Sequence, residues 1–378
     1  MEEGLVARLL TAEHEIVVID ETPRFHVGAG KTWIMLGERT YEQVSQSRLA
    51  LLAPGVRFIE AKVQNIGLSD RTASLGSESL KWNFLVIALG ADLNPASVPG
   101  LAEPAHTFYT VEGAQRLKLA LERFSGGEVA ILIPKAPFKC PPAPYEAALL
   151  LHQAFERRGI GGKARLSIHT VEGTPMATAG PEMGQYIRGE LAQRAIAFFP
   201  QRATARVDGT ANRVVFNDGS EAQYDLLIAI PPHEAPKLVR DAQLTNQSGW
   251  IPVDPLTLQV KQPTDATEVY AVGDVTVVSL PGRYKPDIAL SLPKAGVFAE
   301  AHGRIAAHQI AARISGRPCG EAFDGKGYCY LETGAKRAVK ADGSFFDLPH
   351  PVMQKRTPDE AQMRDKLDWV ERLLRPAR

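Results

Sequence analysis

The three cysteines of this 378-residue chain, Cys140, Cys319 and Cys329, are the residues whose type points most directly to chemistry. Three cysteines in a chain of this length do not form a disulfide scaffold, and their spacing excludes the CxxC pattern of zinc or thioredoxin-like sites. The remaining roles for each cysteine are packing in the core or redox chemistry. Glu146 follows Cys140 by six residues. A carboxylate placed there either exchanges protons with a reactive group or stabilises a helix N-terminus.

Cys140 lies in the stretch PKAPFKCPPAPYE, residues 134–146. Residues 128–133 form an apolar run of strand length, and residues 147–159 predict a helix. Strand, short turn and helix form the frame of a dinucleotide-binding turn, in which small residues let the backbone approach a pyrophosphate. Here the turn holds five prolines, one cysteine and no glycine. The turn therefore lacks the composition of a nicotinamide site, and its prolines stiffen the backbone around Cys140.

Three other strand ends carry residues typical of a flavin-binding domain. The predicted strand at residues 14–21 ends in an acid that bonds a ribose hydroxyl in dinucleotide folds, or else is a solvated carboxylate. Residues 82–95 predict a strand with a glycine turn, and residues 267–276 a short strand followed by Gly-Asp. Each pattern also occurs in ordinary α/β proteins, but their joint occurrence in this order favours a cofactor site. The residues predicted there are Asp20, Ala88, Gly90, Gly273 and Asp274.

The chain opens on EEGLVARLL, which looks like the helix that follows the first strand and glycine-rich turn of such a domain. Gly4 would then be the third glycine of that fingerprint. Three explanations stay open: a misassigned start, a cut chain, or a degenerate relative with weakened cofactor affinity. We expect a chain that begins at Met1 to bind FAD poorly or not at all.

These elements predict an α/β protein with two Rossmann-like dinucleotide-binding domains, the second inserted in the first, plus a small C-terminal region. The FAD-binding domain is expected to be discontinuous, over residues 1–105 and 250–316. Residues 106–249 would form the second dinucleotide-type domain, which carries Cys140. Residues 317–378 would form the C-terminal region, with Cys329 and a terminal helix.

Composition argues against several classes of partner. Lys+Arg and Asp+Glu both number 43, so no net charge attracts nucleic acid. No apolar run approaches the ~20 residues that span a bilayer, and the N-terminus does not read as a secretory signal. The nine histidines show no ligand spacing, so no metal is predicted, and His233 is expected to be structural. A cytoplasmic or peripheral-membrane location is expected.

The C-terminal stretch DEAQMRDKLDWVERLLRPAR has apolar residues at helical spacing from Met363 to Leu374, with Trp369 beside them. Its charge is mixed. The stretch either makes a peripheral membrane contact or forms an ordinary docking or dimer helix.

The order of these motifs resembles the sulfide:quinone oxidoreductase and flavocytochrome c sulfide dehydrogenase flavoprotein group, within the FAD-dependent pyridine nucleotide-disulfide oxidoreductase superfamily. The matching pieces are RFHVGAGKTWIMLG, VIALGA, KCPPAPYE, VYAVGD, LPKAGVFAEAHG and GYCYLETG. The resemblance implies FAD as the cofactor, with Trp33 at its site. It also implies that Lys294, before a helix that starts near Ala295 and Gly296, stabilises the reduced flavin at N1 and the C2 carbonyl. Without the resemblance, Lys294 would be a surface turn residue.

In that group two cysteines face one another across the flavin, and Cys140 and Cys329 match their positions. The resemblance implies that hydrosulfide opens a disulfide or polysulfur bridge between them. The released thiolate then attacks flavin C4a, and two electrons pass to FAD while sulfur stays on the partner cysteine. Glu146 matches the acid that exchanges the proton. Cys319 matches no position in the group, and is either inert or a resolving thiol for Cys329; each cysteine is otherwise a small buried hydrophobe.

The electron acceptor stays open between a quinone and a cytochrome. Quinone-reducing members usually carry a further cysteine in the second domain, which is absent here, so the pattern is closer to the flavocytochrome c type. Sulfide or a related small sulfur compound is the expected substrate. Two other functions compete: an NAD(P)H-dependent quinone or disulfide reductase of the same superfamily, and a non-catalytic relative that has lost FAD.

Overall fold

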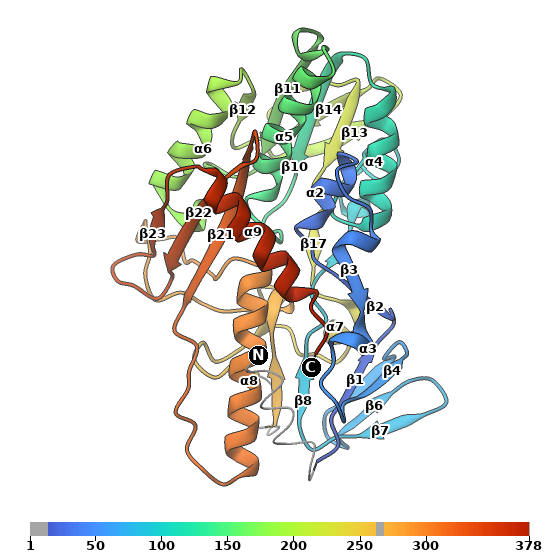
Figure 1. The fold of residues 1–378 in the computed structure, drawn as a ribbon, viewed down its shortest axis with the longest axis vertical. Coiled ribbons are helices and arrows are strands. Elements are labelled where there is room, and N and C mark those ends of the chain that lie inside the picture. The colour runs from blue at the N-terminus through green and yellow to red at the C-terminus, as the bar shows by residue number, and fades with distance from the viewer. Residues whose placement is uncertain (1–13, 262–267, 378) are drawn as a thin grey trace.

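The structure is a computed structural model that describes residues 14–261 and 268–377. A parallel sheet with its helices occupies one end of the molecule, and the long helix α8 with several short strands occupies the other (Figure 1). Helix α9, close to the C-terminus of the chain, lies between these two parts. The predicted Gly4 lies outside the described residues.

The largest parallel sheet has four strands in the order β12-β11-β10-β16. Their bounds are Gly127–Ile133 (β10), Ala164–Thr170 (β11), Ala197–Phe199 (β12) and Leu226–Ala229 (β16). Alternate residues of β10 enter two different cores, with Ile131 on one face and Leu132 on the other, both fully buried. Because both faces of this strand are buried, all of its central residues are apolar.

Three helices and a small antiparallel sheet accompany these strands. The helices are α4 (Val111–Arg123), α5 (Ala143–Arg157) and α6 (Pro181–Gln193). The antiparallel strands are β13 (Thr204–Asp208), β14 (Arg213–Phe216) and β15 (Glu221–Gln223). Helix α5 begins four residues earlier than predicted, because Pro142 at its N-cap and Pro144 in its first turn need no amide hydrogen bond there.

Two of the two-stranded parallel sheets at the other end of the molecule are separate from each other. One pairs β1 (Val17–Asp20) with β4 (Arg57–Glu60), and the other pairs β8 (Leu85–Ile87) with β19 (Val269–Ala271). No strand within the described ranges joins them. Helix α8 (Gly296–Ile314) contributes Phe298 and Ile305 to the core there.

Short elements complete these parts. The paired strands are β2 (Arg24–His26) with β3 (Ser45–Ser47), β5 (Asn65–Gly67) with β6 (Thr72–Ser74) and β7 (Ser79–Lys81), β9 (Asp92–Leu93) with β17 (His233–Glu234), and β18 (Ile251–Pro252) with β20 (Thr276–Val277). The short helices are α2 (Gly30–Met35), α3 (Arg48–Leu51) and α7 (Lys237–Asp241). The 3-10 turns are η1 (Glu42–Val44), η2 (Pro95–Ser97), η3 (Gly161–Lys163), η4 (Ala177–Ala179) and η5 (Gly273–Val275).

The C-terminal elements are an antiparallel sheet and a helix. They are β21 (Lys326–Gly334), β22 (Arg337–Ser344), β23 (Val352–Lys355) and α9 (Glu360–Leu373). Asp359 caps α9 by accepting a hydrogen bond from the amide of Gln362 at 2.8 Å. The apolar stripe of α9 packs on the same core as β10, with Val370 fully buried. The packing uses this stripe inside the protein, so it does not support the membrane contact and fits a docked helix.

The α/β class with Rossmann-like parallel sheets is confirmed. The predicted strand at 128–133 and the predicted helix that ends near Gly316 agree with β10 and α8 within a few residues. The domain boundaries stay a prediction.

Candidate active site

A cavity of about 880 Å³ brings together most of the residues predicted to carry chemistry. The predicted residues that line it are Cys140, Glu146, Asp274, Lys294, Ala295, Gly296 and Cys329. They come from the β10–α5 turn, the η5 turn, the start of α8 and strand β21. Segments from distant parts of the sequence therefore meet at one place.

Cys140 occupies the turn between β10 and α5 in a left-handed backbone conformation, with φ of +55°. Its amide donates to the carbonyl of Lys294 at 2.7 Å, and its carbonyl accepts from the amide of Ala143 at 2.9 Å. The side chain is accessible from the cavity but is surrounded by protein. Burial, and then the charge of Glu146, raises the pKa of the Cys140 thiol to about 11. Unless another charge enters the cavity, this thiol is protonated at neutral pH.

Cys329 lies on β21 and reaches the same cavity from the opposite part of the sequence. Burial, and then the charge of Cys140, raises the pKa of its thiol to about 12. Both thiols are free. Cys319 does not line the cavity, and its thiol donates to the carbonyl of Glu321 at 3.3 Å. This position agrees with the prediction that Cys319 matches no site in the group.

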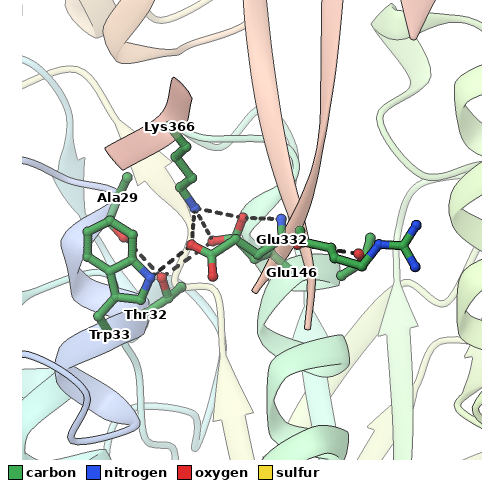
Figure 2. Close-up of polar contacts among 8 residues, drawn as sticks. Ala29, Thr32, Trp33, Glu146, Glu332 and Lys366 are labelled. Atoms are coloured by element: carbon green, nitrogen blue, oxygen red, sulfur yellow. Dashed lines mark hydrogen bonds and ion pairs between the residues drawn. The ribbon is translucent and has the colours of Figure 1, made fainter. Parts of the chain in front are cut away.

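Glu146 belongs to a buried ionic cluster, which we call the Lys366 cluster: Thr32, Trp33, Glu146, Glu332 and Lys366 (Figure 2). The Lys366 ammonium lies 3.0 Å from Oε2 of Glu146 and 2.6 Å from Oε1 of Glu332. The other oxygen of Glu146 accepts from Thr32 at 3.4 Å, and Oε2 also accepts from the amide of Glu332 at 2.9 Å. Glu146 is only 4% exposed. The alternative of an exposed helix-end carboxylate is therefore wrong.

The Lys366 cluster has two carboxylates and one ammonium, so it carries one excess negative charge. Burial lowers the pKa of Lys366, but the two carboxylates outweigh it and the net shift is upward, which keeps the ammonium charged. Burial raises the pKa of Glu146 despite the nearby ammonium. A proton added to this cluster is therefore best accepted by a carboxylate, and Glu146 lines the cavity.

Trp33 does not line the cavity. It is 2% exposed, and its indole N–H donates to Oε1 of Glu332 at 2.8 Å (Figure 2). Trp33 is held in the Lys366 cluster by Glu332 and Lys366, and neither of these residues was predicted from the sequence. Lys366 carried a usable signal, because it falls within the apolar stripe of α9, three residues after Met363 and four before Val370. A lysine in such a stripe indicates a buried carboxylate partner.

The Gly-Asp turn has the features required of a cofactor cradle. Gly273 has φ of +71°, and a Cβ atom at this position would lie 3.0 Å from the Cβ of Ala299 in α8. The carboxylate of Asp274 faces the cavity and accepts no hydrogen bond from any described residue, while burial raises its pKa. A half-buried carboxylate that accepts no hydrogen bond from the described residues, beside a glycine turn, fits a ribityl hydroxyl of FAD. Residues Ala295 and Gly296, at the start of α8, line the same cavity.

Lys294 is 7% exposed, so the surface-turn alternative is wrong. Its ammonium donates to the carbonyls of Asp274 at 2.6 Å and Thr276 at 3.0 Å, and lies 3.4 Å from the centre of the Trp250 ring. Burial lowers its pKa to about 7. Lys294 therefore fastens the Gly-Asp turn, while its own carbonyl holds the amide of Cys140.

Four other predicted positions lie away from this cavity. Gly273 borders only a small adjoining cavity, and neither Ala88 nor Gly90 lines either one. Asp20 accepts from the amide of Thr22 at 2.8 Å and forms an ion pair with Arg48 at 2.7 Å. Its role as a ribose ligand stays a prediction.

His233 is 5% exposed and its Nδ1 lies 2.7 Å from the carbonyl of Pro231, which fits the structural role expected for it. Within the described residues, no group of three or more His, Cys, Asp or Glu side chains is arranged to hold a metal ion. No helix in the described part of the chain is long and apolar enough to cross a membrane.

Comparisons with known proteins agree with this arrangement. The sequence matches the pyridine nucleotide-disulphide oxidoreductase family over residues 4–311. The chain belongs to this family. Members bind FAD, and the protein is accordingly an FAD-dependent oxidoreductase, as predicted.

Among its relatives within this family are two proteins of the group indicated by the motifs. The mitochondrial sulfide:quinone oxidoreductase of Mus musculus is 24% identical over 85% of this chain and 69% of its own length. The sulfide-quinone reductase of Aquifex aeolicus is 24% identical over 82% of this chain and 73% of its own length. The solved structure of the sulfide:quinone oxidoreductase from Aquifex aeolicus superposes with a TM-score of 0.85 at 22% identity, over 98% of this chain and 87% of that one.

Proposed function

We propose that the protein oxidises sulfide, or a related small sulfur compound, through Cys140 and Cys329, and passes the electrons through FAD to a quinone. One observation carries the proposal: two thiols from distant parts of the chain line the same cavity as the Gly-Asp turn. The names of the relatives, which include sulfide:quinone oxidoreductases from an animal and a bacterium, support sulfide and quinone as the substrates.

FAD would be held by the Gly273–Asp274 turn, by the start of α8 at Ala295, and by the His26–Ala29 loop, which also lines the cavity. When bound, FAD supplies the two-electron acceptor that neither thiol provides by itself. The protein contributes a rigid frame, because Lys294 fixes the Gly-Asp turn and the Cys140 turn together.

The sulfur step starts from an oxidised Cys140–Cys329 pair. Hydrosulfide attacks one cysteine sulfur, so that one S–S bond forms and one breaks, which leaves a persulfide on one residue and a thiolate on the other. Joining the persulfide and the thiolate into a bridge with one additional sulfur atom releases two electrons and one proton. Glu146, in a cluster with an excess carboxylate, is placed to exchange that proton.

A quinone is favoured over a cytochrome by the other lining residues. Tyr328, Phe345, Met353, Trp369 and Leu373 give the cavity a wall of apolar and aromatic side chains. Such a wall suits a flat, apolar quinone ring that enters the cavity, whereas a cytochrome transfers electrons without entering one. An NAD(P)H site is disfavoured, because the β10–α5 turn holds Cys140 and prolines where a pyrophosphate needs glycine.

The test is an anaerobic absorption spectrum of the FAD-loaded protein before and after addition of sulfide. We expect sulfide to bleach the oxidised flavin bands, and Cys140→Ser or Cys329→Ser to abolish the bleaching. Cys319→Ser is the matched control and retains it. Bleaching by NADH without a response to sulfide would support the reductase alternative, and failure of the protein to bind FAD would support the non-catalytic one.

A further inference from the structure

Lys31 is a buried cation in the candidate active site. It lies in the first turn of α2 and lines the cavity, yet it is only 9% exposed. Among the described residues, none forms a hydrogen bond or ion pair with its ammonium. A buried ammonium is disfavoured unless it is paired, so this position favours binding of an anion.

Lys31 lines the same cavity as the turn that carries Cys140. Burial, and then the charge of Lys139, lowers the pKa of Lys31 to about 8, whereas negative charge on Cys140 or Asp274 raises it. Lys139 directly precedes Cys140 and also lines the cavity. Lys31 and Lys139 therefore both line the cavity that contains Cys140.

The lysines of this cavity differ in what they bond. Lys294 donates to two backbone carbonyls, and Lys366 lies between two carboxylates, so both have protein partners. Lys31 has none. The charged groups that act on Cys140 are Glu146, Lys366, Lys31 and Asp274. Of the two cations in this set, only Lys31 has an ammonium left to bind an incoming anion.

We propose that Lys31, assisted by Lys139, forms an anion-binding subsite in front of Cys140 that receives the sulfur substrate as a small monoanion such as hydrosulfide. The assignment of the substrate rests on the proposed function, but the anion preference does not. The ammonium holds the anion beside the Cys140 sulfur, where the new S–S bond forms as the Cys140–Cys329 bond breaks and Cys329 leaves as a thiolate.

The test compares two alkylating reagents of nearly equal size, iodoacetate, which is an anion, and iodoacetamide, which is neutral. The FAD-loaded protein carries Cys319→Ser and Cys329→Ser, so that Cys140 is its one thiol, and intact mass reports each rate. Both reagents consume the same thiolate, so the ratio of the two rates cancels the thiolate fraction. We expect the ratio to exceed that of a free cysteine peptide, and Lys31→Met to lower it roughly fivefold.

Matched variants separate charge from packing. Lys31→Arg keeps the charge and is expected to retain the ratio, Lys31→Gln to lower it like Lys31→Met, and Lys139→Met to lower it less because that side chain is more exposed. Flavin absorbance and melting temperature check that each variant is folded.

Two results would overturn the proposal. One is a ratio that Lys31→Met and Lys31→Gln leave unchanged. The other is an anion preference that is present without FAD and disappears when FAD is bound, because Lys31 would then be paired with the cofactor. Neither result depends on turnover of sulfide, so failure of this proposal is distinguishable from failure of the proposed function.

Discussion

Tyr145 and Glu146 are consecutive residues at the start of α5, yet their side chains form hydrogen bonds with two different parts of the protein. The hydroxyl of Tyr145 donates to Oε2 of Glu172, just after β11, at 2.5 Å, while Glu146 accepts from Lys366 in α9. Neighbouring helical residues point roughly 100° apart, which makes this division possible. The turn that presents Cys140 is thus held on one side by the parallel sheet and on the other by the C-terminal helix.

Lys366→Met is predicted to destabilise the protein strongly. It leaves the carboxylates of Glu146 and Glu332 buried without their cation, which costs about 3 to 5 kcal/mol. Urea unfolding, followed by far-UV circular dichroism, gives the change in unfolding free energy. Proteolysis should also reach α9 earlier in this variant.

A matched control is a lysine of β22 that forms an ion pair with the same helix. Lys340 forms an ion pair with Asp365 of α9 at 2.7 Å, but that carboxylate is 45% exposed, so Lys340→Met should cost about 1 kcal/mol or less. The triple variant Lys366→Met, Glu146→Gln, Glu332→Gln should regain part of the lost stability, because no buried charge remains unpaired. Equal losses for Lys366→Met and Lys340→Met would contradict the importance of burial.

Glu172 should give the folding free energy a distinctive pH dependence. Burial raises the pKa of this carboxyl to about 7, although the hydrogen bonds from Tyr145 and Thr170 act to lower it. The folded state therefore keeps a proton that the unfolded state has lost, so its stability falls as pH rises from about 4.5 to 7. Glu172→Gln does not titrate, and its stability relative to the native protein should improve from pH 5 to pH 8.

Unfolding free energies at four pH values across this window test that prediction. Glu182→Gln, at an exposed carboxylate in the first turn of α6, is the control and should show no such trend. Tyr145→Phe removes a bond that favours the ionised form, so it should move the transition to higher pH. Parallel pH profiles for the native protein and Glu172→Gln would show that this carboxyl does not titrate in the window.

The parts of the fold that sequence analysis predicted well are those encoded locally. The run from Val129 to Ile133 predicts a buried strand because every residue is apolar, and the strand is covered on both faces. The Gly-Asp turn at Gly273 is recognisable because its positive φ favours glycine. These signals located the strands and turns that position the site.

The Lys366 cluster was not predictable from such local signals. Trp33 and Glu332 are 299 residues apart, and Glu146 and Lys366 are 220 residues apart. No helical or strand period connects positions at these separations, so the sequence placed Trp33 at the cofactor and left Glu146 either as a proton-exchanging acid or as an exposed helix-end carboxylate, without their buried ionic partners. The apolar stripe around Val370 likewise predicted a buried face without saying which surface buries it.

Gly273→Ala is predicted to weaken FAD binding by about tenfold or more. The residue has φ of +71°, and the new Cβ would press on Ala299, so the Gly-Asp turn must shift at the cofactor. Titration with FAD, followed by flavin fluorescence, measures the dissociation constant. Gly219→Ala is the matched control, since Gly219 has φ of +81° with open space around it, at the β14–β15 hairpin. It should lose stability but keep its affinity for FAD; equal affinities for both variants would argue against this cradle.

The thiols at the cavity should react with iodoacetamide only at unusually high pH. Only a thiolate reacts, and the pKa values of about 11 for Cys140 and about 12 for Cys329 leave little thiolate near neutrality. In the reduced protein the Cys140 rate should rise roughly tenfold per pH unit from pH 8 to 10, with Cys329 slower throughout. Peptide mass mapping measures both rates, and Lys31→Met should lower the Cys140 rate at pH 8 and progressively less toward pH 10, because the Lys31 ammonium, with a pKa of about 8, loses its proton over this range. The raised pKa values also affect stability. The contribution of these thiols to the unfolding free energy is fully present below the ordinary thiol pKa, and it is lost progressively as pH rises from there through about 11. A Cys140 rate that levels off by pH 9 would contradict the electrostatic environment described for the cavity.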